Sequence, residues 1–192
     1  RSYEFRIKQL EKLRQVVADY EEQLYAALYS DLKKNKEECW ITENGFVLTE
    51  IKYAIKKLQG WMEPEKVSTN LVNFPSKSYV YAEPLGVVLI ISPWNYPFNL
   101  LFAPLVGAIA AGNCIVLKAS EFAPATAAVM QQMISASFDE QYISYTSQDG
   151  ATVIPQMMNE FVFDHVFYTG STSIGKKIYE MAAKNLVPVT LE

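Results

Sequence analysis

Hydrophobic positions in the first third of the chain recur every three or four residues, as they do along one face of a helix. A first series predicts an amphipathic helix with an apolar face of Ile7, Leu10, Leu13, Val17, Tyr20, Leu24 and Leu28. A second predicts another helix over about 37–61 that ends before Pro64 and buries Phe46, Leu48, Ile51, Ile55 and Leu58.

The pattern changes over 63–83, where Pro64 and Pro75 mark turns and Tyr79, Val80 and Tyr81 favour a strand. We expect irregular or edge-strand chain here. A segment of this kind can bridge to another part of the protein or to a second subunit.

No charged side chain occurs between Glu83 and Lys118. This run is long enough for a membrane span, but Pro93, Pro97 and Pro104 interrupt any continuous helix. We therefore interpret it as a buried strand over 86–91, a helix over 98–111 and a second strand over 114–117.

Strands and helices continue to alternate up to residue 192. The sequence predicts a helix over 124–137, strands over 142–146 and 164–168 with a short helix over 152–158 between them, a helix up to Asn185, and a fifth strand over 187–192. This order predicts an α/β fold, a Rossmann-like parallel sheet of about five strands with flanking helices, preceded by two amphipathic helices. We expect two regions: helices and a connecting segment over 1–83, and a dinucleotide-binding βα domain over 84–192.

Composition narrows the classes of function. A net charge of −4 in 192 residues gives no basic patch for nucleic acid and no polybasic membrane anchor. The charged first residues do not resemble a secretory signal peptide. Cys39 and Cys114 are the only cysteines, so we expect no disulfide framework and a cytoplasmic location. No residues have the spacing of metal ligands.

Ligands of parallel α/β sheets bind beyond the carboxyl ends of the strands. Asn95 follows the first strand, where its amide can donate to an oxyanion or merely shape the turn before Pro97. Lys118 and Glu121 follow the second strand, where they can bind ribose hydroxyls. Alternatively, Ser120 caps the next helix and Glu121 lies in its first turn.

The later strands end in two further candidates. The fourth is followed by Gly170, Ser171, Thr172, Ser173, Ile174 and Gly175, which can receive a phosphate at a helix N-terminus. Alternatively, Ser173 only caps that helix. Glu192 follows the fifth strand and is a candidate general base if a nucleophile lies nearby. We expect His165 to be structural, and neither cysteine has the surroundings of a catalytic nucleophile.

Several motifs occur together in a fixed order: Pro-Leu-Gly-Val at 84–87, Pro-Trp-Asn-Tyr-Pro-Phe at 93–98, Gly-Asn at 112–113 with Val-Leu-Lys at 116–118, Phe-Asp-His-Val-Phe-Tyr-Thr-Gly-Ser-Thr at 163–172, and Pro-Val-Thr-Leu-Glu at 188–192. Together they resemble the aldehyde dehydrogenase family, and within it the class 3 and fatty aldehyde dehydrogenase branch. The resemblance covers essentially the whole chain.

The resemblance implies NAD- or NADP-dependent oxidation of aldehydes, medium- or long-chain aliphatic or aromatic, to carboxylic acids. In the family, a cysteine thiolate attacks the aldehyde, hydride passes to the nicotinamide, and the thioester is hydrolysed. By resemblance, Asn95 is the oxyanion-hole amide and Glu192 the general base. Cofactor contacts are implied for Ser92, Trp94, Lys118, Glu121 and residues 170–175. Acidic Glu121 favours NAD over NADP.

The chain also departs from the family pattern. Ala119 stands where the family usually has proline, and Ser-Gln-Asp-Gly at 147–150 replaces a more glycine-rich turn. The family chain continues after the equivalent of Glu192 to its catalytic cysteine. We therefore expect the incomplete first part of a longer polypeptide, inactive alone and homodimeric when complete. The alternatives are a truncated, non-catalytic nucleotide-binding or interaction module, and an unstable remnant.

Overall fold

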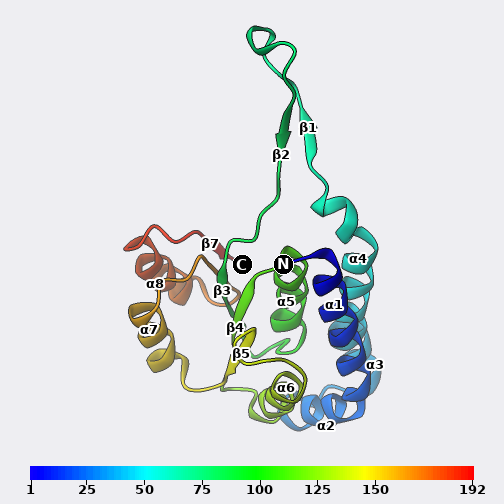
Figure 1. Ribbon diagram of the computed structural model, residues 1–192. Helices are drawn as coiled ribbons and strands as arrows, with labels where there is room; N and C mark the ends of the chain where they lie inside the picture. Colours follow the sequence, from blue (N-terminus) through cyan, green and yellow to red (C-terminus); the bar gives the residue numbers. More distant parts are fainter.

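A five-stranded parallel sheet forms the centre of the computed structural model, which describes residues 1–192 (Figure 1). Its strands are β3 (Val87–Ile91), β4 (Cys114–Lys118), β5 (Ile143–Thr146), β6 (His165–Tyr168) and β7 (Val189–Leu191). Their order across the sheet is β5-β4-β3-β6-β7, so the chain builds one half outward from β3 and then returns to build the other. The predicted Rossmann-like fold is confirmed.

Alternate residues of β3 face two separate hydrophobic cores. Val88 and Ile90 pack on the side of α5 (Asn99–Ala111) and α6 (Pro124–Ser137). Leu89 and Ile91 pack on the side of α7 (Gly150–Glu160) and α8 (Thr172–Ala183). Figure 1 shows these helix pairs on opposite faces of the sheet. Burial on both faces explains why β3 is a continuous apolar run.

The amino-terminal helices form a further layer against α5 and α6 (Figure 1). The first predicted helix is two helices, α1 (Tyr3–Asp19) and α2 (Glu21–Leu32), because the backbone at Tyr20 leaves the helical conformation. Leu10 and Ile51 share one core with Phe102 of α5. The division of the chain between residues 83 and 84 stays a prediction.

The second predicted helix has three parts: a single turn, α3 (Lys36–Cys39), a π-helical turn (Trp40–Asn44), and α4 (Gly45–Met62). The prediction that Phe46 is buried is wrong, since 47% of it is exposed. The buried stripe of α4 is instead Val47, Ile51, Ala54 and Leu58. These four residues are spaced by four, three and four positions, so they lie on one face of α4, the face toward α5. Phe46 lies to the side of that face.

Strands β1 (Glu65–Val67) and β2 (Ser78–Val80) form an antiparallel hairpin that projects away from the body (Figure 1). Its tip includes a 3₁₀ turn (Leu71–Asn73), and Leu71, Val72 and Phe74 are each more than four-fifths exposed. The predicted strand character of residues 79 and 80 is confirmed. None of the helices combines the length and the apolar character that a membrane span requires.

Candidate functional site

Four strands of the sheet end at one level, which we call the carboxyl edge. The backbone ladder continues one residue past each strand: the N–H groups of Ser92, Ala119, Thr169 and Glu192 donate to the carbonyls of Lys118, Thr146, Ile91 and Tyr168, at 2.9–3.2 Å. The strand-end residues singled out in the sequence therefore come together along one side of the sheet.

Lys118 and Glu121 form an ion pair at the end of β4. Lys118 Nζ lies 2.8 Å from Glu121 Oε2, and the other carboxylate oxygen accepts a hydrogen bond from Gly150 N at 2.9 Å. Burial acts to raise the pKa of Glu121, but the hydrogen bonds from Lys118 and Gly150 outweigh it and hold that pKa below its ordinary value. The carboxylate is therefore ionised and fixed in place.

The alternative in which Ser120 caps the next helix is wrong. Helix α6 begins at Pro124, and its N-cap residue is Ala123, which has no side chain able to accept a hydrogen bond. Asp31, at the end of α2, supplies the cap instead: its carboxylate accepts from Ala125 N at 3.2 Å and from Thr126 N and Oγ1, each at 2.8 Å. Nothing in the sequence pattern indicates this contact, because Asp31 is 94 residues from Ala125.

Helix α8 begins at the carboxyl edge, and its first residues, 172–174, are exposed. Its N-cap is Ser171, which makes no side-chain capping bond, so the alternative in which Ser173 caps the helix is wrong. A Cβ at Gly170 would collide with the hydroxyl of Tyr168, which itself donates to Ser171 O at 3.2 Å. The uncapped N-terminus has the geometry that receives a phosphate group.

Two hydroxyl groups at the carboxyl edge are buried without a hydrogen-bond partner: Ser92 Oγ after β3 and Thr169 Oγ1 after β6. Such atoms carry a desolvation cost unless a ligand or solvent pairs with them. Trp94 is 51% exposed, so it is not a core residue and can line a ligand site. These features fit a dinucleotide at this edge.

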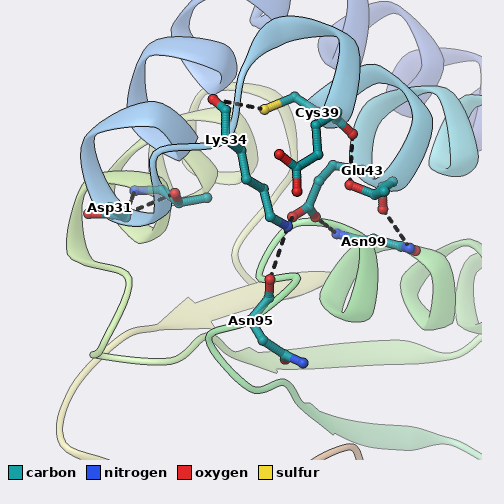
Figure 2. A network of polar contacts seen from close by, with 9 residues as sticks. Asp31, Lys34, Cys39, Glu43, Asn95 and Asn99 are labelled. Carbon is teal, nitrogen blue, oxygen red and sulfur yellow. Dashed lines mark hydrogen bonds and ion pairs between the residues drawn. The ribbon is translucent and has the colours of Figure 1, made fainter.

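Asn95 lies on the turn after β3 with its side chain exposed. Its backbone carbonyl accepts a hydrogen bond from Lys34 Nζ at 3.0 Å, and Lys34 forms a 2.6 Å ion pair with Glu43 (Figure 2). Burial raises the pKa of Glu43, and the hydrogen bonds from Lys34 and from Asn99 N only partly oppose this rise. Sequence reasoning singled out neither Lys34 nor Glu43, because their contacts with Asn95 and Asn99 join positions 61 and 56 residues apart.

The remaining candidates are placed as follows. Glu192 is exposed at the end of β7, and its backbone is joined to Tyr168 and Gly170. His165 Nε2 lies 3.1 Å from Thr190 Oγ1, a contact between neighbouring strands, and burial lowers its pKa. Cys39 is fully buried, and burial together with the charge of Glu43 raises its pKa to about 11. Cys114 begins β4, at the opposite end from the carboxyl edge.

The family model described as "Aldehyde dehydrogenase family" matches residues 1–192. The chain belongs to this family. It is 48% identical over 188 residues to a 4,4'-diaponeurosporen-aldehyde dehydrogenase of Staphylococcus aureus, which covers 98% of this chain and 40% of that protein. It is 43% identical over its whole length to aldehyde dehydrogenase family 3 member H1 of Arabidopsis thaliana, covering 39% of it. A dog enzyme named "Aldehyde dehydrogenase, dimeric NADP-preferring" is also 43% identical, with 42% covered.

Solved aldehyde dehydrogenase structures show the same arrangement. The chain superposes on substrate-bound Staphylococcus aureus AldH with a TM-score of 0.96 and 46% identity, covering 100% of this chain and 41% of that one. Betaine aldehyde dehydrogenase from Staphylococcus aureus in complex with NAD⁺ superposes with a TM-score of 0.84 at 26% identity, covering 100% of this chain and 38% of that one. NADP-dependent glyceraldehyde-3-phosphate dehydrogenase from Bacillus halodurans with NADP superposes with a TM-score of 0.83 at 25% identity, covering 100% of this chain and 40% of that one. The chain thus spans about two fifths of the length of the relatives that it matches.

Proposed function

We propose that this chain is the cofactor-binding part of an NAD- or NADP-dependent aldehyde dehydrogenase that oxidises aldehydes to carboxylic acids. The observation that carries the proposal is the carboxyl edge itself, where a neutral amide, an ion pair, an uncapped helix N-terminus and an exposed carboxylate follow four strands of one sheet. Membership of the family supports the reaction class.

The cofactor is held by groups at the ends of β4 and β6. Lys118 and Glu121 bind the adenosine ribose hydroxyls, the ammonium as donor and the carboxylate as acceptor. The pyrophosphate lies at the N-terminus of α8, where no side chain caps the first helical turn. Ser92 and Thr169 give their unpaired hydroxyls to the same ligand. When bound, the nicotinamide supplies the hydride acceptor.

The aldehyde reacts between Asn95 and Glu192. The amide of Asn95 donates a hydrogen bond to the oxyanion that forms when a thiolate adds to the carbonyl carbon. Glu192 takes a proton from the water that later attacks the thioester carbonyl. The thiolate comes from a cysteine in the rest of the polypeptide, because Cys39 is fully buried and Cys114 lies at the wrong end of β4.

Substrate range, assembly and location follow the sequence expectations. We propose medium- or long-chain aliphatic or aromatic aldehydes as substrates and the cytoplasm as location. We also propose a homodimer, supported by the dog relative named as dimeric and by the exposed apolar residues of the projecting hairpin, Leu71, Val72 and Phe74.

The test is an assay of the full-length polypeptide with aliphatic aldehydes of increasing chain length and with benzaldehyde, each with NAD and with NADP. We expect reduced cofactor to form. In Asn95→Ala, kcat should fall about 10²- to 10³-fold while cofactor binding persists, because one oxyanion donor is lost. If the protein binds dinucleotide but never oxidises an aldehyde, it is a non-catalytic nucleotide-binding module instead.

A further inference from the structure

The turn that carries Asn95 is held by a residue from a distant part of the chain. Lys34 lies 61 positions earlier, just after α2, and its ammonium donates to the backbone carbonyl of Asn95 at 3.0 Å. The side chain of Asn95 points away from Lys34 (Figure 2). Lys34 therefore fixes the backbone of the turn while leaving the amide of Asn95 free to meet a substrate.

The ammonium of Lys34 is surrounded by three partners. Besides the carbonyl of Asn95, it contacts Glu43 Oε1 at 2.6 Å and lies 3.8 Å from the centre of the Tyr96 ring. Lys34 is 7% exposed and Glu43 is fully buried. An ammonium has three N–H donors and no acceptor. The two oxygen atoms and the aromatic ring therefore provide one partner for each N–H group and hold the ammonium in place.

Glu43 extends the hold to the next helix. Its second carboxylate oxygen accepts a hydrogen bond from the N–H of Asn99 at 2.8 Å. Asn99 is the first residue of α5, and the N-cap residue Phe98 offers no side-chain acceptor. Asn99 Nδ2 also donates to Thr42 O at 2.9 Å. One buried ion pair thus fixes both the turn at Asn95 and the start of the helix four residues later.

Stability alone does not account for this ion pair. A buried ion pair is often no more stabilising than an apolar pair of similar volume. Glu43 also lies in the π-helical turn Trp40–Asn44, an uncommon conformation that often occurs at functional sites. Both polar side-chain atoms of its neighbour Asn44 are buried without partners. The π-helical turn and the unpaired polar atoms of Asn44 both cost free energy of folding. Both occur where Glu43 contacts Lys34 and Asn99.

We infer that Lys34 and Glu43 are positioning residues, which hold the turn so that the amide of Asn95 lies where the oxyanion develops. This inference rests on the proposed function of Asn95. A donor stabilises a transition state most when its position is fixed before the reaction begins, and displacement by about 1 Å can cost about 100-fold in rate.

The test replaces the ion pair by apolar residues in one double variant, Lys34→Met with Glu43→Leu. The double variant avoids a buried, unpaired charge, which would unfold the protein for a trivial reason. The matched control is Lys36→Met with Glu22→Gln, since Lys36 and Glu22 form an ion pair of the same length, 2.6 Å, that is exposed.

Two measurements read the result. In the 192-residue chain, NMR follows the side-chain amide of Asn95, assigned by its loss in Asn95→Ala, and the hydrogen exchange of Asn99 N–H. In the full-length polypeptide, kcat and KM for the aldehyde are measured. We expect a more mobile Asn95 amide, faster exchange at Asn99, and a kcat lowered about tenfold or more with KM within about twofold. The control variant should match the parent in all of these.

An unchanged Asn95 amide with unchanged exchange at Asn99 would overturn the inference, as would a folded double variant with the parent's kcat. A parent polypeptide that oxidises no aldehyde would overturn the proposed function instead, and the NMR result alone would then decide whether the pair positions Asn95.

Discussion

Lys118 Nζ lies 2.8 Å from Glu121 Oε2, and the lysine is almost completely buried while the carboxylate is partly exposed. This ion pair lies just after β4. The carboxylate of Glu121 is held by Lys118 and by Gly150 N, and in the proposed function it accepts from the adenosine ribose.

The charge of Glu121 should set the choice of cofactor. A carboxylate repels the 2′-phosphate of NADP but accepts hydrogen bonds from the free hydroxyl of NAD. We expect Glu121→Gln to bind NADP about tenfold more tightly relative to NAD, which corresponds to about 1.4 kcal/mol. Isothermal titration calorimetry with both cofactors measures this ratio. The same ratio in variant and parent would show that Glu121 does not face the 2′ position.

Asp31 should stabilise the protein by capping α6. Asp31→Ala removes an acceptor for two backbone N–H groups and one hydroxyl, so we expect the free energy of unfolding to fall by about 1–2 kcal/mol. Thr126→Val removes only the hydroxyl and should cost about 1 kcal/mol or less. Urea denaturation gives both values. A variant at Asp31 as stable as the parent would mean that the cap contributes nothing.

The protein should lose stability as the pH falls below about 6.5 through the titration of His165. Burial lowers the pKa of this histidine in the folded state, so the unfolded chain binds the proton first. The stability linked to the neutral form of His165 is fully present above the pKa of the unfolded chain. It is lost as the pH falls through the pKa of the folded protein. Since His165 is the only histidine, its imidazole NMR signal reports the folded pKa directly.

Thermal unfolding measured from about pH 7.5 to about pH 5.5 shows how stability changes with pH. This range covers about one pH unit on either side of the ordinary histidine pKa. In His165→Gln the slope of stability against pH should be smaller than in the parent. A folded pKa above 6.5 would reverse the sign and contradict the lowering of the pKa of His165 by its partial burial.

The two cysteines should differ in reactivity. With a pKa of about 11, Cys39 is a thiolate in only about one molecule in a thousand at pH 8, and it is also fully buried. Peptide mapping after iodoacetamide treatment of the native protein should find Cys39 unmodified, and both cysteines should react in urea. Equal labelling of Cys39 in native and unfolded protein would contradict its burial.

The sequence predicted the sheet well because its strands are short apolar runs bounded by glycine, proline and polar residues. The carboxyl-edge positions followed from that prediction, since parallel strands bring their ends together. What the sequence did not predict depends on long-range contacts. Lys34 reaches Asn95 across 61 positions and Glu43 reaches Asn99 across 56. Asp31 caps a helix that begins 93 residues later, at Pro124.

Local patterns also failed where the helix geometry was irregular. The break at Tyr20 and the π-helical turn Trp40–Asn44 have no proline or glycine within them, so periodicity predicted two uninterrupted helices. The cap alternatives at Ser120 and Ser173 failed because both rested on residue preference alone. At α6, a tertiary contact from Asp31 takes the place of the expected local cap.

The most direct test of the proposed site is a titration of the ¹⁵N-labelled 192-residue chain with NAD, followed by amide chemical shifts. The account predicts saturable shifts at Lys118–Glu121 and at residues 170–175, and none around Cys114 and Tyr142 at the opposite end of the sheet. Absence of these shifts at saturating NAD and NADP, or shifts confined to the end that holds Cys114, would contradict a cofactor site at the carboxyl edge.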